Sequence, residues 1–163
     1  MALAKGICMG RGIPLVGVPT LDCVAHAVRC WRGLIAPVLD ARRGEVYFSA
    51  YRRTQGTLER QTDYLALAPN DVIKMVKDLA GGDKVLLTGN GLLRYGSEMA
   101  AGLGSGVTSA PENLWTARPG IVGKLGMDLL RLGQCLDYET VEPMYVRPSE
   151  AERSARNARD KLA

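Results

Sequence analysis

The sequence has few of the residues that build catalytic and metal centres. Its 163 residues include one histidine, His26, and four cysteines, Cys8, Cys23, Cys30 and Cys135. The cysteines show no CxxC spacing, which excludes the common zinc and dithiol motifs. The single histidine counts against a metallopeptidase that needs a histidine pair, and the absence of a GxSxG motif removes the nucleophile elbow of serine hydrolases.

Long apolar runs and a strong charge bias are also missing. The opening "MALAKGICMGRG" is too short in apolar residues for a secretory signal, so we expect reduced thiols and a cytoplasmic location without membrane contact. The formal net charge of +4 is scattered along the chain. It permits contact with nucleic acid without indicating it. The tail from residue 150 to 163 mixes both signs, which favours a solvated extension.

The first third of the chain predicts a helix, a strand and a second helix. The opening residues read as the end of a helix already under way, so we expect further chain before them. Residues 13–18, "IPLVGV", are typical of a buried strand. Thr20 is the expected N-cap of the next helix, with Asp22 in its first turn. The apolar stripe of this helix consists of Leu21, Val24, Ala25, Val28 and Trp31.

Three antiparallel strands are predicted next, over residues 34–41, 45–53 and 57–67, joined by glycine-containing turns. Val46, Phe48 and Ala50 alternate with polar or aromatic residues, which indicates a sheet with one drier face. Helices and short strands then alternate from Pro69 to residue 134. This order predicts an α/β layered fold.

Three residues on the second predicted helix raise the question of a metal site. Cys23, His26 and Cys30 are spaced so that they could share a helix face, and zinc accepts these donors. No fourth ligand is indicated. Buried cysteine packing beside a half-exposed histidine is the favoured interpretation, and we expect no metal.

The glycine turn "TGNG" lies between a predicted strand and a predicted helix. Gly89, Asn90 and Gly91 are candidate anion-binding residues, because small residues let backbone amides approach a phosphate. Glycines are also used in such turns for steric reasons alone. Both interpretations stay open.

The stretch "VLDARRGEVYFSAYRR" crowds charges at a turn that contains Asp40, Arg42, Gly44, Glu45 and Tyr47. Two carboxylates suit acid–base chemistry only if their surroundings separate their pKa values. The arginines between Asp40 and Glu45 keep carboxylates ionised. A turn braced by salt bridges is therefore favoured over a catalytic pair, and we expect no catalytic residue here.

Three stretches resemble the bacterial TsaB, or YeaZ, family, once labelled glycoprotease-like. They are "GIPLVGVPTLDCVAHA", "LDARRGEVYFSAYRR" and "VEPMYVRPS", which match in order the family's Gly-Ile-Pro strand, "DAR-x-GEVY" hairpin and "P-x-YLR" ending. The resemblance implies the second lobe of an actin-like, sugar-kinase-like ATPase fold. It implies a mixed sheet with an antiparallel three-strand segment flanked by helices.

The resemblance also implies a function. Members of the family are non-catalytic scaffolds that pair with the catalytic homologue TsaD and the ATPase TsaE. Together they attach threonylcarbamoyl to the adenosine beside the anticodon of tRNA. The alternative is an enzyme of the same superfold, either a small-molecule kinase or a glycoprotease-type metallopeptidase.

The chain departs from the family pattern in its first lobe, whose "IDT" strand and "GPGSFTG" segment are absent. We therefore expect residues 1–33 to be a remnant of that lobe with an inter-lobe helix, 34–149 to be the second lobe, and 150–163 to be the tail. No cofactor is expected, and a nucleotide only within a complete complex. Arg42 stands where active relatives carry a phosphate-loop glycine.

The same departure bears on the partners of the chain. Leu3, Ile7 and Met9 would lie at the helical interface through which family members pair, without the helix that normally covers them. Exposed apolar residues of this kind favour self-association. A homo-oligomer is therefore expected when the chain is alone.

Overall fold

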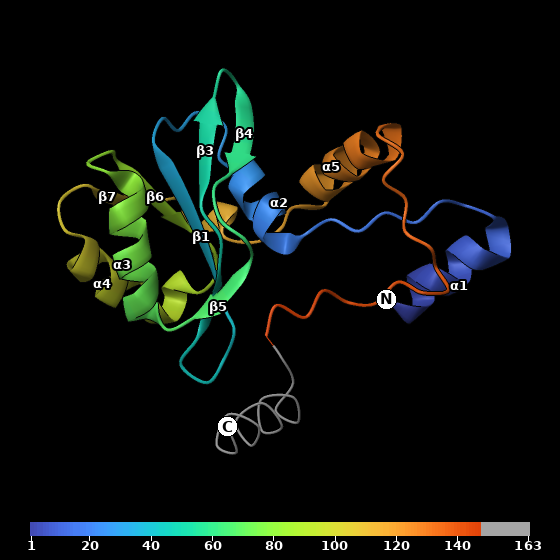
Figure 1. Cartoon of the computed structure of the whole chain (residues 1–163), viewed down its shortest axis with the longest axis horizontal. Coiled ribbons are helices and arrows are strands. Elements are labelled where there is room, and N and C mark those ends of the chain that lie inside the picture. Colours follow the sequence, from blue (N-terminus) through green and yellow to red (C-terminus); the bar gives the residue numbers. More distant parts are fainter. Residues whose placement is uncertain (148–163) are drawn as a thin grey trace, which may run out of the picture.

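The structure is a computed structural model that describes residues 1–147 (Figure 1). Its helices are α1 (Ala2–Arg11), α2 (Thr20–Ala27), α3 (Pro69–Ala80), α4 (Leu92–Leu103), α5 (Pro119–Arg131) and the short 3₁₀ helix η1 (Glu112–Leu114). Its strands are β1 (Leu34–Asp40), β2 (Val46–Phe48), β3 (Tyr51–Thr54), β4 (Thr57–Arg60), β5 (Leu65–Leu67), β6 (Val85–Thr88) and β7 (Val107–Ser109).

The predicted antiparallel segment is confirmed, with one interruption in its second strand, between β2 and β3, and one in its third strand, between β4 and β5. Strands β2 and β3 continue a single ladder along β1, because Val38 faces Phe48 and Leu34 faces Arg52 in the same register. The gap between β2 and β3 is closed by a side chain. The Thr62 hydroxyl accepts the Ala50 amide at 3.0 Å, and the Thr62 carbonyl accepts the Ser49 hydroxyl at 3.0 Å.

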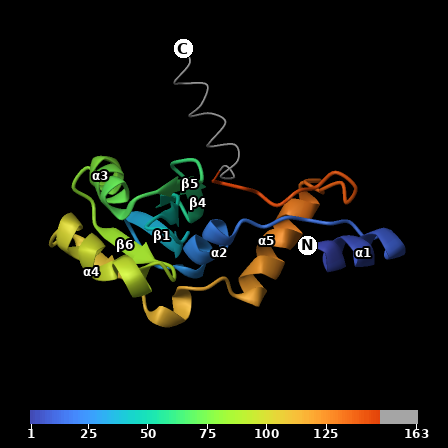
Figure 2. The same ribbon diagram turned by 90° about the horizontal axis from the view of Figure 1, so that it is seen from below.

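Parallel strands extend the sheet on the other side of β1. Strand β6 pairs with β1, and β7 pairs with β6, both in parallel. Helices α3 and α4 cover one face of this mixed sheet, and α2 covers the other (Figures 1 and 2). The open mixed sheet flanked by helices agrees with the predicted fold class.

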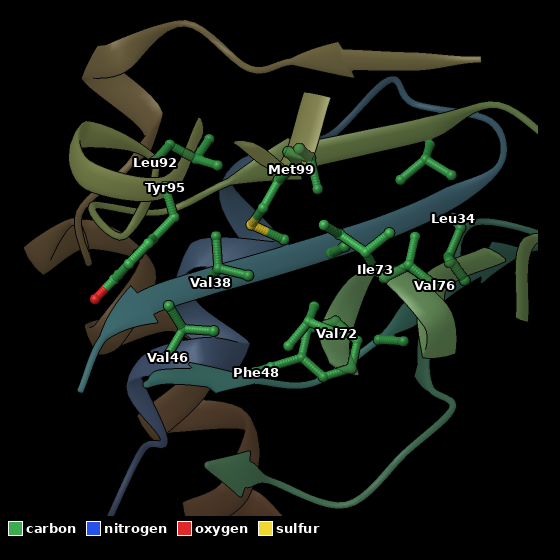
Figure 3. Close-up of a cluster of buried hydrophobic side chains, with 14 of the residues drawn as sticks. Leu34, Val38, Val46, Phe48, Val72, Ile73, Val76, Leu92, Tyr95 and Met99 are labelled. Atoms are coloured by element: carbon green, nitrogen blue, oxygen red, sulfur yellow. The ribbon is translucent and has the colours of Figure 1, made fainter. Parts of the chain in front are cut away.

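The core is divided by the pleat of β1, whose successive side chains point to opposite faces. Leu34 and Val38 pack with Val72 and Met99 of the helices α3 and α4 (Figure 3). Ile35 packs on the other face with residues of α2. Each large apolar side chain buried in this way stabilises the fold by roughly 1.5–3 kcal/mol. The sheet therefore depends on helices from both sides.

The predicted alternation along β2 and β3 is correct for one face only. Val46, Phe48 and Ala50 are fully buried, as expected. Ser49 and Tyr51 are buried as well, so the expectation of one drier face is wrong at this end of the sheet. The reason is that α2 covers the second face, which no local pattern in the strand announces.

The predicted strand at residues 13–18 is also wrong, because only Leu15 forms a bridge, to Leu136. Helix α2 begins after Pro19, so Thr20 is its first residue and not its side-chain cap. The helix ends at Ala27, because Val28 already has an extended backbone with φ −88° and ψ 97°. The Val28 carbonyl accepts a hydrogen bond from the Arg53 guanidinium at 2.9 Å.

Helices α1 and α5 lie beside the sheet body and away from α3 and α4 (Figure 2). Neither helix contains a buried residue. Helix α2, by contrast, packs on the sheet. The expected division at residue 33 stays a prediction, and the predicted tail at residues 150–163 lies outside the described residues. None of the helices between residues 1 and 147 has the length and apolar character needed to span a bilayer.

Candidate functional site at the carboxyl end of β1 and β6

The charged stretch forms a tight hairpin turn between β1 and β2. The Glu45 amide donates to the Arg42 carbonyl at 3.1 Å, and the Ala41 amide donates to the Glu45 carbonyl at 3.1 Å. Arg43 and Gly44 have φ values of 55° and 82°. Positive φ at both central residues is the requirement of a type I′ turn, the hairpin turn whose twist matches that of the strands.

Both the side chain and the backbone amide of Asp40 form hydrogen bonds. Its carboxylate accepts the Arg42 amide at 2.8 Å, and its own amide donates to the Asn90 side-chain oxygen at 3.2 Å. The hairpin turn and the glycine turn, 50 residues apart, therefore meet at one edge of the sheet. This is the edge at the carboxyl ends of parallel strands, where open α/β sheets bind ligands.

The interpretation of a turn braced by salt bridges is confirmed for Glu45. Its partner is Arg147, which the sequence does not predict. The Glu45 carboxylate pairs with the Arg147 guanidinium at 2.9 Å, and both side chains are about one-fifth exposed. Arg147 belongs to the closing stretch "VEPMYVRPS", and only the shared motif order hinted at its role. The expectation that Arg42 braces the turn is wrong for its side chain. Within residues 1–147, Arg42 contributes only backbone hydrogen bonds.

The glycine turn packs directly against β1. A Cβ atom on Gly89 would lie 2.1 Å from the Val38 carbonyl oxygen, and Gly89 has a φ of 104°. The Gly91 amide donates to the same carbonyl at 3.1 Å. The amides of Leu92 and Leu93 are taken by the carbonyls of Gly89 and Asn90. The geometry therefore favours the steric explanation of these glycines over an anion cradle.

An apolar groove of about 500 Å³ lies beside the hairpin turn. Tyr47 and Leu39 line it from the sheet, residues 17–21 from the start of α2, and residues 141–144 from the closing segment. All three stretches that carry the family resemblance therefore meet around this groove. The sequence order predicts the motifs but not their convergence.

A partly buried polar cluster, which the sequence does not predict, ties α2 to the sheet. The Asp22 carboxylate accepts the hydroxyls of Tyr51 at 2.6 Å and of Tyr64 at 2.8 Å. Burial raises the pKa of both tyrosines above the ordinary value, and the hydrogen bonds to Asp22 raise it further. Asp22 was expected only as a helix-start residue, and nothing in its local sequence indicates two tyrosine partners.

The candidate metal residues do not share a helix face. Cys23 is buried on α2, whereas Cys30 is exposed and lies beyond the end of that helix. His26 is half-buried, and burial lowers its pKa. No cluster of metal-ligating side chains is present in the described part of the chain. Buried packing beside a half-exposed histidine is confirmed for Cys23, and it is wrong for Cys30, which is exposed.

The predicted interface residues of α1 are exposed. The exposed fractions of Leu3, Ile7 and Met9 are 78%, 53% and 60%. Leu3 and Ile7 are four residues apart and share a face, but Met9 is turned away from Ile7 by about 200° because each residue rotates by roughly 100°. The Lys5 ammonium donates to the Val141 carbonyl at 2.9 Å, which links α1 to the closing segment.

The fold is shared with two solved structures from Pseudomonas aeruginosa. The first, an uncharacterized protein with similarity to peptidase YeaZ, has a TM-score of 0.72 at 22% identity, covering 90% of this chain and 65% of the other. The second, YeaZ, has a TM-score of 0.68 at 19% identity, covering 88% of this chain and 65% of the other. The chain is thus an α/β protein with the fold of these two YeaZ structures.

Residues 1–105 match the family model described as TsaD, tRNA N6-adenosine threonylcarbamoyltransferase, and the chain belongs to this family. Within it, the relatives found are TsaB and YeaZ proteins, as the sequence resemblance predicted. The tRNA threonylcarbamoyladenosine biosynthesis protein TsaB of Bacillus subtilis is 28% identical over 93% of this chain. The Escherichia coli protein of the same name is 30% identical over 50% of it. The chain spans 64% and 36% of the lengths of these relatives.

Proposed function

We propose that this chain serves in tRNA threonylcarbamoyladenosine biosynthesis as a non-catalytic scaffold. It pairs with a TsaD-like catalytic subunit and works with a TsaE-like ATPase on tRNA in the cytoplasm. The family match over residues 1–105 is the observation that carries the proposal. The TsaB names of the curated relatives support the choice of pathway.

The hairpin turn supports a non-catalytic role. Asp40 and Glu45 are held by a backbone amide and by Arg147, so neither carboxylate is placed as a free general base. The amides at the start of α4 already have carbonyl partners, and phosphate binding would have to compete with them. The chain by itself accordingly uses no nucleotide cofactor.

Helix α1 supports the pairing role. Leu3 and Ile7 form an apolar pair on an otherwise solvated helix, and a partner helix that covers both side chains would remove them from water. Without a partner, the same pair promotes a homo-oligomer. The apolar pair is therefore the proposed contact in both assemblies.

The test is co-purification of the chain with the TsaD-like protein of the same organism. The double variant Leu3→Asp/Ile7→Asp should lose the partner, and light scattering should show it as a monomer. Leu93→Asp is the matched control, since Leu93 is 75% exposed on α4, far from α1 (Figure 1). Retention of the partner by the double variant would contradict the proposed contact.

Titration with ATP and magnesium tests the non-catalytic role separately. The chain alone should show no tight binding. Micromolar affinity would favour the alternative of a kinase of the same superfold.

A further inference from the structure

A cationic pocket of about 360 Å³ is lined by residues that precede β1 and β6 and by residues of β3. The start of β1 and the β3–β4 hairpin lie at the opposite end of the sheet from the hairpin turn (Figure 1). The charged lining residues of the pocket are Arg32, Arg52, Arg53, Asp83 and Lys84. Four cations thus face one carboxylate. For comparison, the formal net charge of the whole chain is only +4. The lining by itself therefore carries a formal net charge of +3 from four cations and one carboxylate.

The single carboxylate is already neutralised. Asp83 pairs with Arg52, whose guanidinium also donates to the Leu79 carbonyl at 2.6 Å, at the end of α3. Arg53 donates to the carbonyls of Gly56 and Val28 at 3.0 and 2.9 Å, and its buried Nε has no partner among the described residues. The charge of Arg53 therefore meets only neutral oxygens. Its side chain is held in place, so little entropy is lost when an anion binds.

Gly33 brings together the backbone segments that carry two further cations, Arg32 and Lys84. With a φ of 124°, it lies so close to Lys84 that a Cβ atom would be 2.3 Å from the Lys84 carbonyl oxygen. The next amide, of Leu34, donates to that same oxygen at 3.0 Å. Arg32 and Lys84 therefore line the same pocket, and neither side chain has an ion pair within residues 1–147. Like charges that line one pocket repel each other, so an anion bound there would relieve the repulsion.

We propose that this pocket binds a phosphate group of the RNA backbone, an assignment that rests on the proposed function. Guanidinium groups match phosphate oxygens with paired donors, and an ammonium adds a point charge. The pocket lacks the apolar lining of a site that would hold a nucleobase. The pocket therefore binds the RNA backbone through charge and does not recognise the base sequence. Its role is to position the RNA.

The test is fluorescence anisotropy with a labelled tRNA transcript. Arg32→Ala/Lys84→Ala should weaken binding at least tenfold. The dependence of log affinity on log salt between about 50 and about 200 mM should become shallower by about 0.7–0.9, since the loss of one phosphate contact removes that much from the slope. The control Lys74→Ala/Lys124→Ala changes the net charge equally, on α3 and α5, and should bind as the wild type. Equal weakening by both variants, or no binding by the wild type, would overturn the proposal.

Competition at constant ionic strength distinguishes the source of the phosphate. Inorganic phosphate and ATP should fail to displace the transcript, and displacement by either at low millimolar concentration would assign the pocket to a free phosphate ligand and overturn the RNA assignment. Co-purification separates this inference from the proposed function. Arg32→Ala/Lys84→Ala should retain the TsaD-like partner while it loses RNA.

Discussion

The Arg147 guanidinium lies 2.9 Å from the Glu45 carboxylate, across 102 residues of sequence. The pair fastens the closing segment of the described chain to the hairpin turn that begins the antiparallel part of the sheet. Both side chains are about four-fifths buried, so water weakens their attraction less than it does at the surface.

Arg147→Ala should lower the free energy of unfolding by about 1–2 kcal/mol, since it removes a charge-assisted hydrogen bond from a partly buried carboxylate. Urea denaturation measures the change. Arg131→Ala is the matched control, because its pair with Asp128 is mostly exposed, and it should cost less than about 0.5 kcal/mol. If both variants lose the same free energy of unfolding, the Glu45–Arg147 pair stabilises the fold no more than an exposed ion pair does.

Gly89→Ala should lower the free energy of unfolding by more than about 2 kcal/mol, because the new Cβ atom meets the Val38 carbonyl and the backbone stays at positive φ. Gly106→Ala is the control, since nothing lies within 4 Å of its Cβ position. Thermal melts of both variants provide the comparison. A Gly89→Ala protein of normal stability would revive the anion-binding interpretation of this turn.

Arg42→Gly should leave stability unchanged or raise it by up to about 1 kcal/mol, because glycine adopts the φ of 61° without the strain that arginine carries there. Arg42→Ala should change it by less than about 0.5 kcal/mol, since the guanidinium makes no hydrogen bond to residues 1–147. Chemical denaturation of the wild type and of both variants measures these changes in the free energy of unfolding. A loss above about 1 kcal/mol in Arg42→Ala would restore its side chain to a bracing role.

Tyr51→Phe should destabilise the fold at pH 7 by about 1.5–3 kcal/mol, through loss of the hydrogen bond to the Asp22 carboxylate. The pKa of Tyr51 is raised in the folded state, mainly by burial. The stability it provides is therefore complete below the unfolded pKa of about 10 and is lost as the pH rises above it.

The difference in unfolding free energy between wild type and Tyr51→Phe should therefore shrink from pH 10 to pH 11. Urea titrations across this range measure it. Tyr145→Phe is the control, because Tyr145 is 76% exposed and its variant should track the wild type at every pH. A difference that stays constant through pH 11 would contradict a raised pKa.

Helices and buried strands with strong local patterns were predictable. The predicted alternation of helices and short strands after Pro69 is confirmed by α3 and β6. The stretch 13–18 has the same apolar character as β6 but no neighbouring strand to pair with beyond one bridge. Its failure shows that an apolar run predicts burial more safely than it predicts a ladder.

By itself, the sequence determined the α/β order of elements, the family, and the hairpin at Gly44, because periodicity and turn chemistry act over a few neighbouring residues. Only the tertiary structure decided that Glu45 pairs with Arg147, that Asp22 accepts hydrogen bonds from two tyrosines, and that Gly33 packs against Lys84. Each of these contacts joins residues far apart in the chain. Their energies depend on distance and burial, which local patterns do not encode.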